Sequence, residues 1–193
     1  MNTPNKLTLI RVLMVPIFLF VLLLEMVFPD WATGTRAIAG LIFIAASVTD
    51  MIDWRMARKY NLVTNFGKFL DPVADKVLVF AALIAFIELG LASSVAVVIM
   101  MAREFLVSSM RMVAASKGKV IAAGKSGKVK TAVTMVSIVV ILLLLALSGF
   151  GVPAFPLPLT LISNILIWIC AALTIYSGAE YLIRNREVFT GSM

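Results

Sequence analysis

Histidine is absent from this chain of 193 residues, and cysteine occurs once, as Cys170. The lack of histidine removes the most common general base and the most common transition-metal ligand. Any acid–base or metal chemistry must therefore rest on carboxylates, which favour hard ions such as Mg²⁺ or Mn²⁺. A single cysteine also excludes an intramolecular disulfide.

Charge is scarce as well. Only 14% of the residues are charged, whereas 62% are hydrophobic, and the mean hydropathy is +1.06. A soluble domain of this length would be nearer half apolar. Long apolar runs recur along the whole chain, so there is no room for a separate soluble domain. We therefore predict a single membrane-embedded domain over residues 1–193, with no nucleic-acid partner.

The apolar runs define the predicted helices, because a helix that crosses the hydrocarbon needs about 20 mostly apolar residues. The sequence predicts an all-α integral membrane protein, a bundle of about six transmembrane helices, over residues 7–28, 36–56, 72–91, 93–113, 130–149 and 157–180. An even number of spans puts both termini on one side. Every basic residue except Arg36 lies on or toward that side, and the positive-inside rule makes it cytoplasmic.

Acidic residues number only ten, and four of them form two closely spaced pairs. Asp50 and Asp53 are three residues apart, and Asp71 and Asp75 are four apart, so each pair shares one face of a helix. Asp71 precedes Pro72, which predicts an N-cap followed by proline at the first helical position. The second and third helices would then bring all four carboxylates to one membrane boundary.

Four converging carboxylates repel one another and require cations, and two divalent ions would neutralise them and form a clamp for displacement at phosphorus. One alternative is that these aspartates pair with neighbouring lysines and arginines at the interface. Ionisable residues in membrane spans are usually functional, which favours the metal site. A divalent-cation transporter is another interpretation, although transport sites usually lie near the midplane rather than at a boundary.

The acidic pattern also carries a family resemblance. Asp50-x2-Asp53-x3-Ala57-Arg58, followed by Gly67-x3-Asp71-x3-Asp75, resembles the signature of the CDP-alcohol phosphotransferases. The likeness to one branch, the bacterial phosphatidylglycerophosphate synthases, covers nearly the whole chain. It includes Pro4-Asn5-Lys-Leu-Thr8-x2-Arg11, the whole segment from Asn65 to Lys76, Arg103-Glu104-Phe with Arg111, and Gly127-Lys128-Val-Lys130-Thr131.

The resemblance implies transfer of a phosphatidyl group from CDP-diacylglycerol to sn-glycerol 3-phosphate with release of CMP, at the cytoplasmic face of a bacterial inner membrane. It implies that the four aspartates hold two Mg²⁺ or Mn²⁺ ions and that Asp75 is also the general base. Arg58 would bind donor phosphate, and the motif positions Ala57 and Gly67 would lie at the substrate. Family members are often homodimers, so we expect a homodimer among membrane lipids.

Two positions depart from the family pattern. Trp54 stands where the signature has glycine, directly after the second aspartate, and Ser109 stands where this branch usually has glycine. The Trp54 indole either turns outward into the interfacial aromatic belt or fills space that the cytidine nucleotide needs. The second alternative predicts weak activity or an altered donor, and the sequence leaves both open.

A basic stretch predicts the site of the acceptor. Arg103 falls within an apolar run, where an unpaired cation is costly, and Arg111 follows about two helical turns later. With Lys125 and Lys128 they predict a pocket for a phosphate-bearing acceptor, because arginine binds phosphate in a bidentate manner. Glycerol 3-phosphate and an inositol phosphate both satisfy this requirement, whereas serine would need less positive charge. Attraction to anionic lipids is the alternative.

Asn5 and Thr8 stand one helical turn apart near the N-terminus. They are candidates for contact with the lipid donor. Ordinary capping of the first helix explains the same residue types at the same place. Both interpretations stay open at the level of the sequence.

Overall fold

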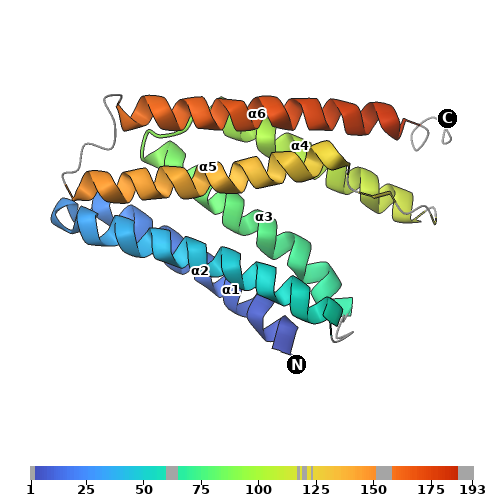
Figure 1. Cartoon of the computed structure of the whole chain (residues 1–193), viewed down its shortest axis with the longest axis horizontal. Coiled ribbons are helices and arrows are strands. Elements are labelled where there is room, and N and C mark those ends of the chain that lie inside the picture. Colours follow the sequence, from blue (N-terminus) through green and yellow to red (C-terminus); the bar gives the residue numbers. More distant parts are fainter. Residues whose placement is uncertain are drawn as a thin grey trace. The chain divides into compact units, whose positions relative to one another are not determined.

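The computed structural model describes residues 3–59, 65–116, 118, 121, 122, 124–150 and 158–186, and for residues 3–8, 50–59, 65–72, 74 and 75 it describes the backbone alone. Within these residues the chain forms six α-helices and no strand (Figure 1). The helices are α1 Thr3–Leu23, α2 Ala32–Lys59, α3 Asn65–Glu88, α4 Ser94–Ser116, α5 Lys125–Gly149 and α6 Leu159–Arg184. Two short 3-10 turns, η1 Leu24–Met26 and η2 Pro29–Trp31, connect α1 to α2.

The six predicted segments each coincide with a helix, and so the all-helical prediction is confirmed. The predicted start of the third helix is wrong. Helix α3 begins at Asn65, six residues before Asp71, so Asp71 is not its N-cap and Pro72 lies in the helix interior. Proline inside a helix removes one hydrogen bond, but transmembrane helices tolerate it. Pro16 lies inside α1 in the same way.

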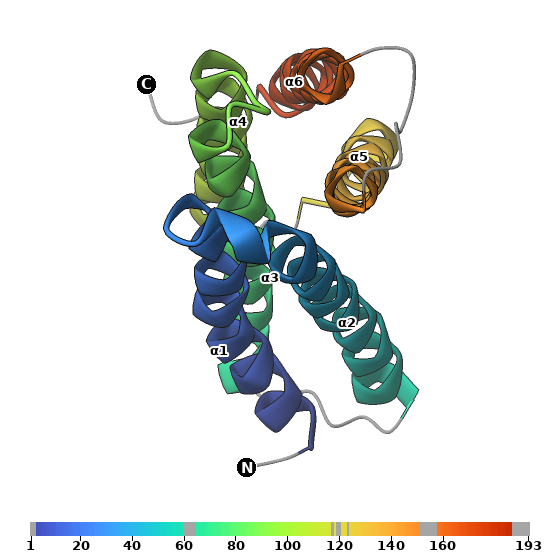
Figure 2. The same cartoon turned by 90° about the vertical axis from the view of Figure 1, so that its left-hand side faces the viewer.

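The first of two compact units comprises Met1–Leu89 and Ile138–Leu159. Helix α1 packs against both α2 and α3, and the rings of Phe18 and Phe43 meet in its core with centroids 5.7 Å apart. Within this unit, α1, α2 and α3 run in alternating directions. The N-terminal end of α1, the C-terminal end of α2 and the N-terminal end of α3 therefore lie at the same end of this unit (Figures 1 and 2).

The second unit comprises Gly90–Ser137 and Thr160–Met193, and so contains α4, the first half of α5 and nearly all of α6. Val107 and Met110 of α4 pack against Tyr181 of α6. Small residues on α6, including Ser177 and Thr174, are fully buried, and their hydroxyls donate to carbonyls of their own helix. Small side chains of this kind allow close approach of neighbouring helices in membranes.

Four helices in the described part of the chain are long and apolar enough to cross a membrane: Leu9–Met26, Pro29–Thr49, Lys125–Gly149 and Leu159–Arg184. Large apolar side chains on them face outward, for example Phe20, Leu41 and Ile183, each about two-thirds exposed or more. An outer surface of this kind suits a lipid solvent. Helix α4 has sufficient length but carries Arg103, Glu104 and Arg111. That all six helices span the membrane stays a prediction.

Candidate active site

The acidic signature lies on two helices. Asp50, Asp53 and Ala57 fall in the last third of α2, because this helix continues to Lys59 rather than ending near residue 56 as predicted. Their spacing, i, i+3 and i+7, puts them on one face. Gly67, Asp71 and Asp75 all fall in the first half of α3 at spacings of four, because that helix begins at Asn65.

The earlier start of α3 places Asp71 and Asp75 beyond the first turn of the helix. The first turn of α3 contains no acidic residue. The helix dipole acts mainly within the first turn, so it favours Asp71 and Asp75 less than an N-cap position would. Neutralisation of these carboxylates therefore rests more heavily on cations.

The helix arrangement brings the signature segments to the same end of the first unit, together with the start of α1 (Figure 2). That end carries the predicted site residues Asn5, Thr8, Asp50, Asp53, Ala57, Arg58, Gly67, Asp71 and Asp75. The side chains of these nine residues, and that of Trp54, lie outside the described part. Their roles as metal ligands, general base or substrate contacts stay predictions. No cluster of three metal-ligating side chains occurs among the side chains that are described.

Arg11 on α1 was not selected as a site residue from the sequence. Its side chain is 1% exposed and takes part in a polar interaction. A buried arginine in a membrane helix is retained only where it is compensated, and usually marks a functional region. Two signals for Arg11 are present in the sequence: it is a cation within the apolar run that starts at Leu7, and it ends the N-terminal segment that carries the family resemblance.

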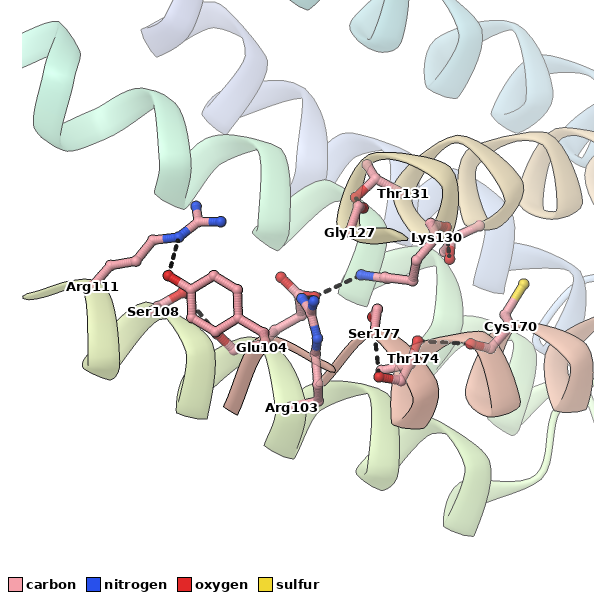
Figure 3. A network of polar contacts seen from close by, with 12 residues as sticks. Arg103, Glu104, Ser108, Arg111, Gly127, Lys130, Thr131, Cys170, Thr174 and Ser177 are labelled. Carbon is pink, nitrogen blue, oxygen red and sulfur yellow. Dashed lines mark hydrogen bonds and ion pairs between the residues drawn. The ribbon is translucent and has the colours of Figure 1, made fainter. Parts of the chain in front are cut away.

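The second unit contains a largely buried ionic cluster of Arg103, Glu104 and Lys130 (Figure 3). Oxygen Oε1 of Glu104 accepts hydrogen bonds from Arg103 Nη1 at 2.7 Å and from Lys130 Nζ at 2.6 Å. The three side chains are 12%, 17% and 8% exposed, in the order Arg103, Glu104, Lys130. Two cations on one carboxylate leave one positive charge in excess, which is costly at such burial unless an anion joins the cluster.

Two glycines flank Arg103. A Cβ atom on Gly178 of α6 would lie 2.9 Å from Arg103 Cγ, which is closer than side-chain carbons approach one another. A Cβ atom on Gly127 of α5 would lie 3.6 Å from Arg103 Nη2, an ordinary contact. Arg103 therefore passes α6 at a point that only glycine leaves open.

The other predicted acceptor residues are less closely joined. Arg111 donates through Nε to the Tyr181 hydroxyl at 3.3 Å, and its guanidinium carbon lies 5.5 Å from the centre of that ring. Lys125 and Lys128 are on the first turn of α5 and form no ion pair with any side chain that the structure describes. The predicted four-residue pocket therefore stays a prediction, and among the described side chains Lys130 is the lysine that shares the Glu104 carboxylate with Arg103.

Comparison with known proteins agrees with the signature. A family model described as CDP-alcohol phosphatidyltransferase matches residues 1–176. The chain is 40% identical over 200 residues to CDP-diacylglycerol–glycerol-3-phosphate 3-phosphatidyltransferase of Bacillus subtilis, covering 99% of this chain and 98% of the relative. It is 33% identical over 188 residues to the protein of the same name in Rickettsia felis, with 97% of each chain covered.

A third relative carries a related name. The chain is 36% identical over 183 residues to a probable phosphatidylglycerophosphate synthase of Mycobacterium tuberculosis, covering 95% of this chain and 81% of the relative. The family match and these near full-length similarities come from independent comparisons and agree. The chain therefore belongs to the CDP-alcohol phosphatidyltransferase family of enzymes.

Proposed function

We propose that this enzyme transfers the phosphatidyl group of CDP-diacylglycerol to sn-glycerol 3-phosphate, giving phosphatidylglycerophosphate and CMP. The observation that carries the proposal is the four-aspartate signature on α2 and α3, in a chain similar over almost its entire length to synthases named for this reaction. The buried cluster of Arg103, Glu104 and Lys130 supports the choice of acceptor, because its excess positive charge suits a phosphate.

Enzymes of this family generally depend on divalent metal ions. The donor set of this chain fits such ions, because four aspartates and no histidine favour a hard cation. Asp50, Asp53, Asp71 and Asp75 would hold two Mg²⁺ or Mn²⁺ ions. Bound there, the ions supply charge neutralisation at the donor pyrophosphate and its leaving group.

The chain's own residues have separate parts in the transfer. Asp75 accepts the proton of the attacking hydroxyl of glycerol 3-phosphate. The hydroxyl oxygen bonds to the phosphatidyl phosphorus, the bond from this phosphorus to the CMP oxygen breaks, and CMP leaves with the electron pair. Arg58 binds donor phosphate, and Arg103 with Lys130 binds the phosphate of the acceptor. Asn5, Thr8, Ala57 and Gly67 line the donor.

The acceptor distinguishes this proposal from others within the family. A cluster with excess positive charge disfavours a neutral acceptor such as serine, because the buried cation would stay uncompensated. An inositol phosphate meets the same charge requirement as glycerol 3-phosphate. The names of the relatives favour glycerol 3-phosphate.

We further propose that all six helices span a bacterial inner membrane as one domain, with both termini and the site on the cytoplasmic side. The distribution of basic residues supports this orientation. Arg36 is the one basic residue assigned to the opposite side, and it lies in the first turns of α2. A homodimer is proposed from the family alone, and its test is the mass of the purified protein in detergent.

The test of function is CMP release by the purified full-length protein supplied with CDP-diacylglycerol, glycerol 3-phosphate and Mg²⁺ or Mn²⁺. We expect release that requires the acceptor, is lost with EDTA and returns when metal is restored. Serine and an inositol phosphate, each in place of glycerol 3-phosphate, are the matched controls. Faster release with either one would overturn the proposed acceptor.

Trp54 motivates a second candidate, a weakly active or retargeted family member. If folded, metal-loaded protein releases no CMP with any acceptor, Trp54→Gly is the next variant. Activity gained by Trp54→Gly would show that the indole blocks the nucleotide. Continued inactivity would remove Trp54 as the explanation.

A further inference from the structure

Two contacts determine the course of the Arg103 side chain. The first is the packing of its stem against Gly178, which has no side chain. The stem passes α6 at Gly178, where a Cβ atom would lie 2.9 Å from Cγ, 3.7 Å from Nε and 3.9 Å from Cδ. Two carbon atoms are most favourably separated by about 3.5–4.0 Å, so a Cβ atom here forces the stem to another course. The glycine therefore determines where the stem runs.

The second contact is with the Glu104 carboxylate, which accepts a hydrogen bond from Nη1 at 2.7 Å. The same oxygen holds Lys130 Nζ at 2.6 Å, so the carboxylate is itself fixed by a helix distant in the sequence. The packing of the stem against Gly178 and the hydrogen bond at Nη1 together restrict the rotation of the planar guanidinium. Its orientation is thereby restricted before any ligand arrives.

The opposite edge of the guanidinium contains a donor without a partner among the described residues. This donor is Arg103 Nε, which is buried. Nε and the neighbouring Nη2 form the edge that binds a carboxylate or phosphate through two parallel hydrogen bonds. A buried donor without a partner costs free energy, and an arriving phosphate would recover it.

We propose that Gly178 is a positioning residue that acts through Arg103. Because Gly178 has no side chain, the Arg103 stem can pack against α6 at this point. The hydrogen bond from Nη1 to Glu104 then orients the Nε–Nη2 edge toward the phosphate of the acceptor. The proposal rests on the proposed function, since it takes glycerol 3-phosphate as that acceptor. It concerns α6, a helix that supplies none of the residues predicted from the sequence to bind substrate.

The test is Gly178→Ala in the full-length protein, with kcat and the KM values of both substrates measured in detergent micelles. The KM for glycerol 3-phosphate should rise about tenfold or more, because displaced arginine loses bidentate contact, while the KM for CDP-diacylglycerol stays within about twofold. Binding of glycerol 3-phosphate, measured calorimetrically, should weaken in parallel.

Gly149→Ala is the matched control. Its Cβ atom would lie 2.9 Å from Thr33 Cα, an equally close contact in the other unit. This variant should lower the melting temperature and leave both KM values unchanged. If Gly178→Ala behaves in the same way, Gly178 has a structural role only, and the proposal is wrong.

A double variant tests whether Gly178 acts through Arg103. Arg103→Ala removes the Cγ atom that a new Cβ atom at position 178 would meet, so adding Gly178→Ala should change the KM for glycerol 3-phosphate no further. Additive effects would contradict the proposal. If Arg103→Ala has no measurable turnover, the test rests on calorimetric binding of glycerol 3-phosphate to the single variant Gly178→Ala. An affinity equal to that of the wild-type protein would overturn the proposal.

The outcome also separates this inference from the proposed function. A wild-type protein that uses a different acceptor overturns the function. A wild-type protein that uses glycerol 3-phosphate, with unchanged KM in Gly178→Ala, overturns the positioning role alone.

Discussion

Two partly buried ionic clusters among the described residues differ in how completely their charges are matched. In the first unit, Arg36 donates through Nε to Glu25 Oε2 at 2.6 Å and through Nη2 to Glu25 Oε1 at 3.3 Å. Its Nη1 donates to Ser148 Oγ at 3.1 Å. All three guanidinium nitrogens have partners, both carboxylate oxygens are used, and the pair is neutral.

The cluster of Arg103, Glu104 and Lys130 in the second unit is neither neutral nor saturated. One carboxylate oxygen serves two cations, and Arg103 Nε has no partner among the described residues. A neutral, saturated cluster joins helices and requires nothing further, whereas a buried cluster with excess charge is stabilised by an anion. The contrast supports a structural role for the first cluster and the proposed binding role for the second.

The largest effect is expected from Asp75→Asn, which removes the proposed general base and the negative charge of one proposed metal ligand. Turnover should fall by about 10²–10⁴-fold, because the general base is lost. Binding of Mn²⁺ and of glycerol 3-phosphate should be partly or wholly kept, as measured by calorimetry. Normal turnover would contradict the role of Asp75.

Lys130→Met makes the second cluster neutral, like the first. The kcat/KM for glycerol 3-phosphate should fall by about 30-fold or more, because the acceptor phosphate loses one of its two proposed cationic partners, a loss of about 2 kcal/mol or more. The KM for CDP-diacylglycerol should stay unchanged, which distinguishes this variant from Asp75→Asn. A lower melting temperature with unchanged kinetics would show that the second cluster has a structural role like the first, and would contradict its proposed binding role.

Arg36→Met removes the cation of the first cluster. Because the arginine side chain is 23% exposed, the expected loss of stability is moderate, about 1–3 kcal/mol, seen as a lower melting temperature. Both KM values should stay within about twofold.

The double variant Glu25→Gln with Arg36→Met removes both charges of the first cluster. It should recover much of the lost stability, since no buried charge remains unpaired. Recovery would confirm that the first cluster acts only through its own charge balance. A changed KM for either substrate in these variants would contradict the structural assignment.

Tyr181→Phe should have the smallest effect. It removes the hydroxyl that accepts from Arg111 Nε and keeps the ring beside the guanidinium. A single hydrogen bond contributes about 0.5–1.5 kcal/mol, so the KM for glycerol 3-phosphate should rise by no more than about tenfold. A larger rise would place Arg111 in the acceptor site beside Arg103.

The sequence by itself was sufficient for the number and approximate position of the helices, because apolar runs of spanning length are a local property of the chain. It also identified the aspartate signature and the anomaly of Arg103 in an apolar run, since both depend on residue types at fixed short spacings. The start of α3 was misplaced because Asp71 before Pro72 is a local capping signal, which the helix from Asn65 overrides.

Only the tertiary structure decided which side chains meet across helices. It joined Lys130, rather than Lys125 or Lys128, to Glu104, and it laid the Arg103 stem against Gly178. These contacts depend on the rotation and separation of packed helices, which are set by side-chain volumes along the whole interface and not by spacing along any one segment. For that reason a glycine on α6, without chemistry of its own, becomes visible as a determinant of the site only in the folded protein.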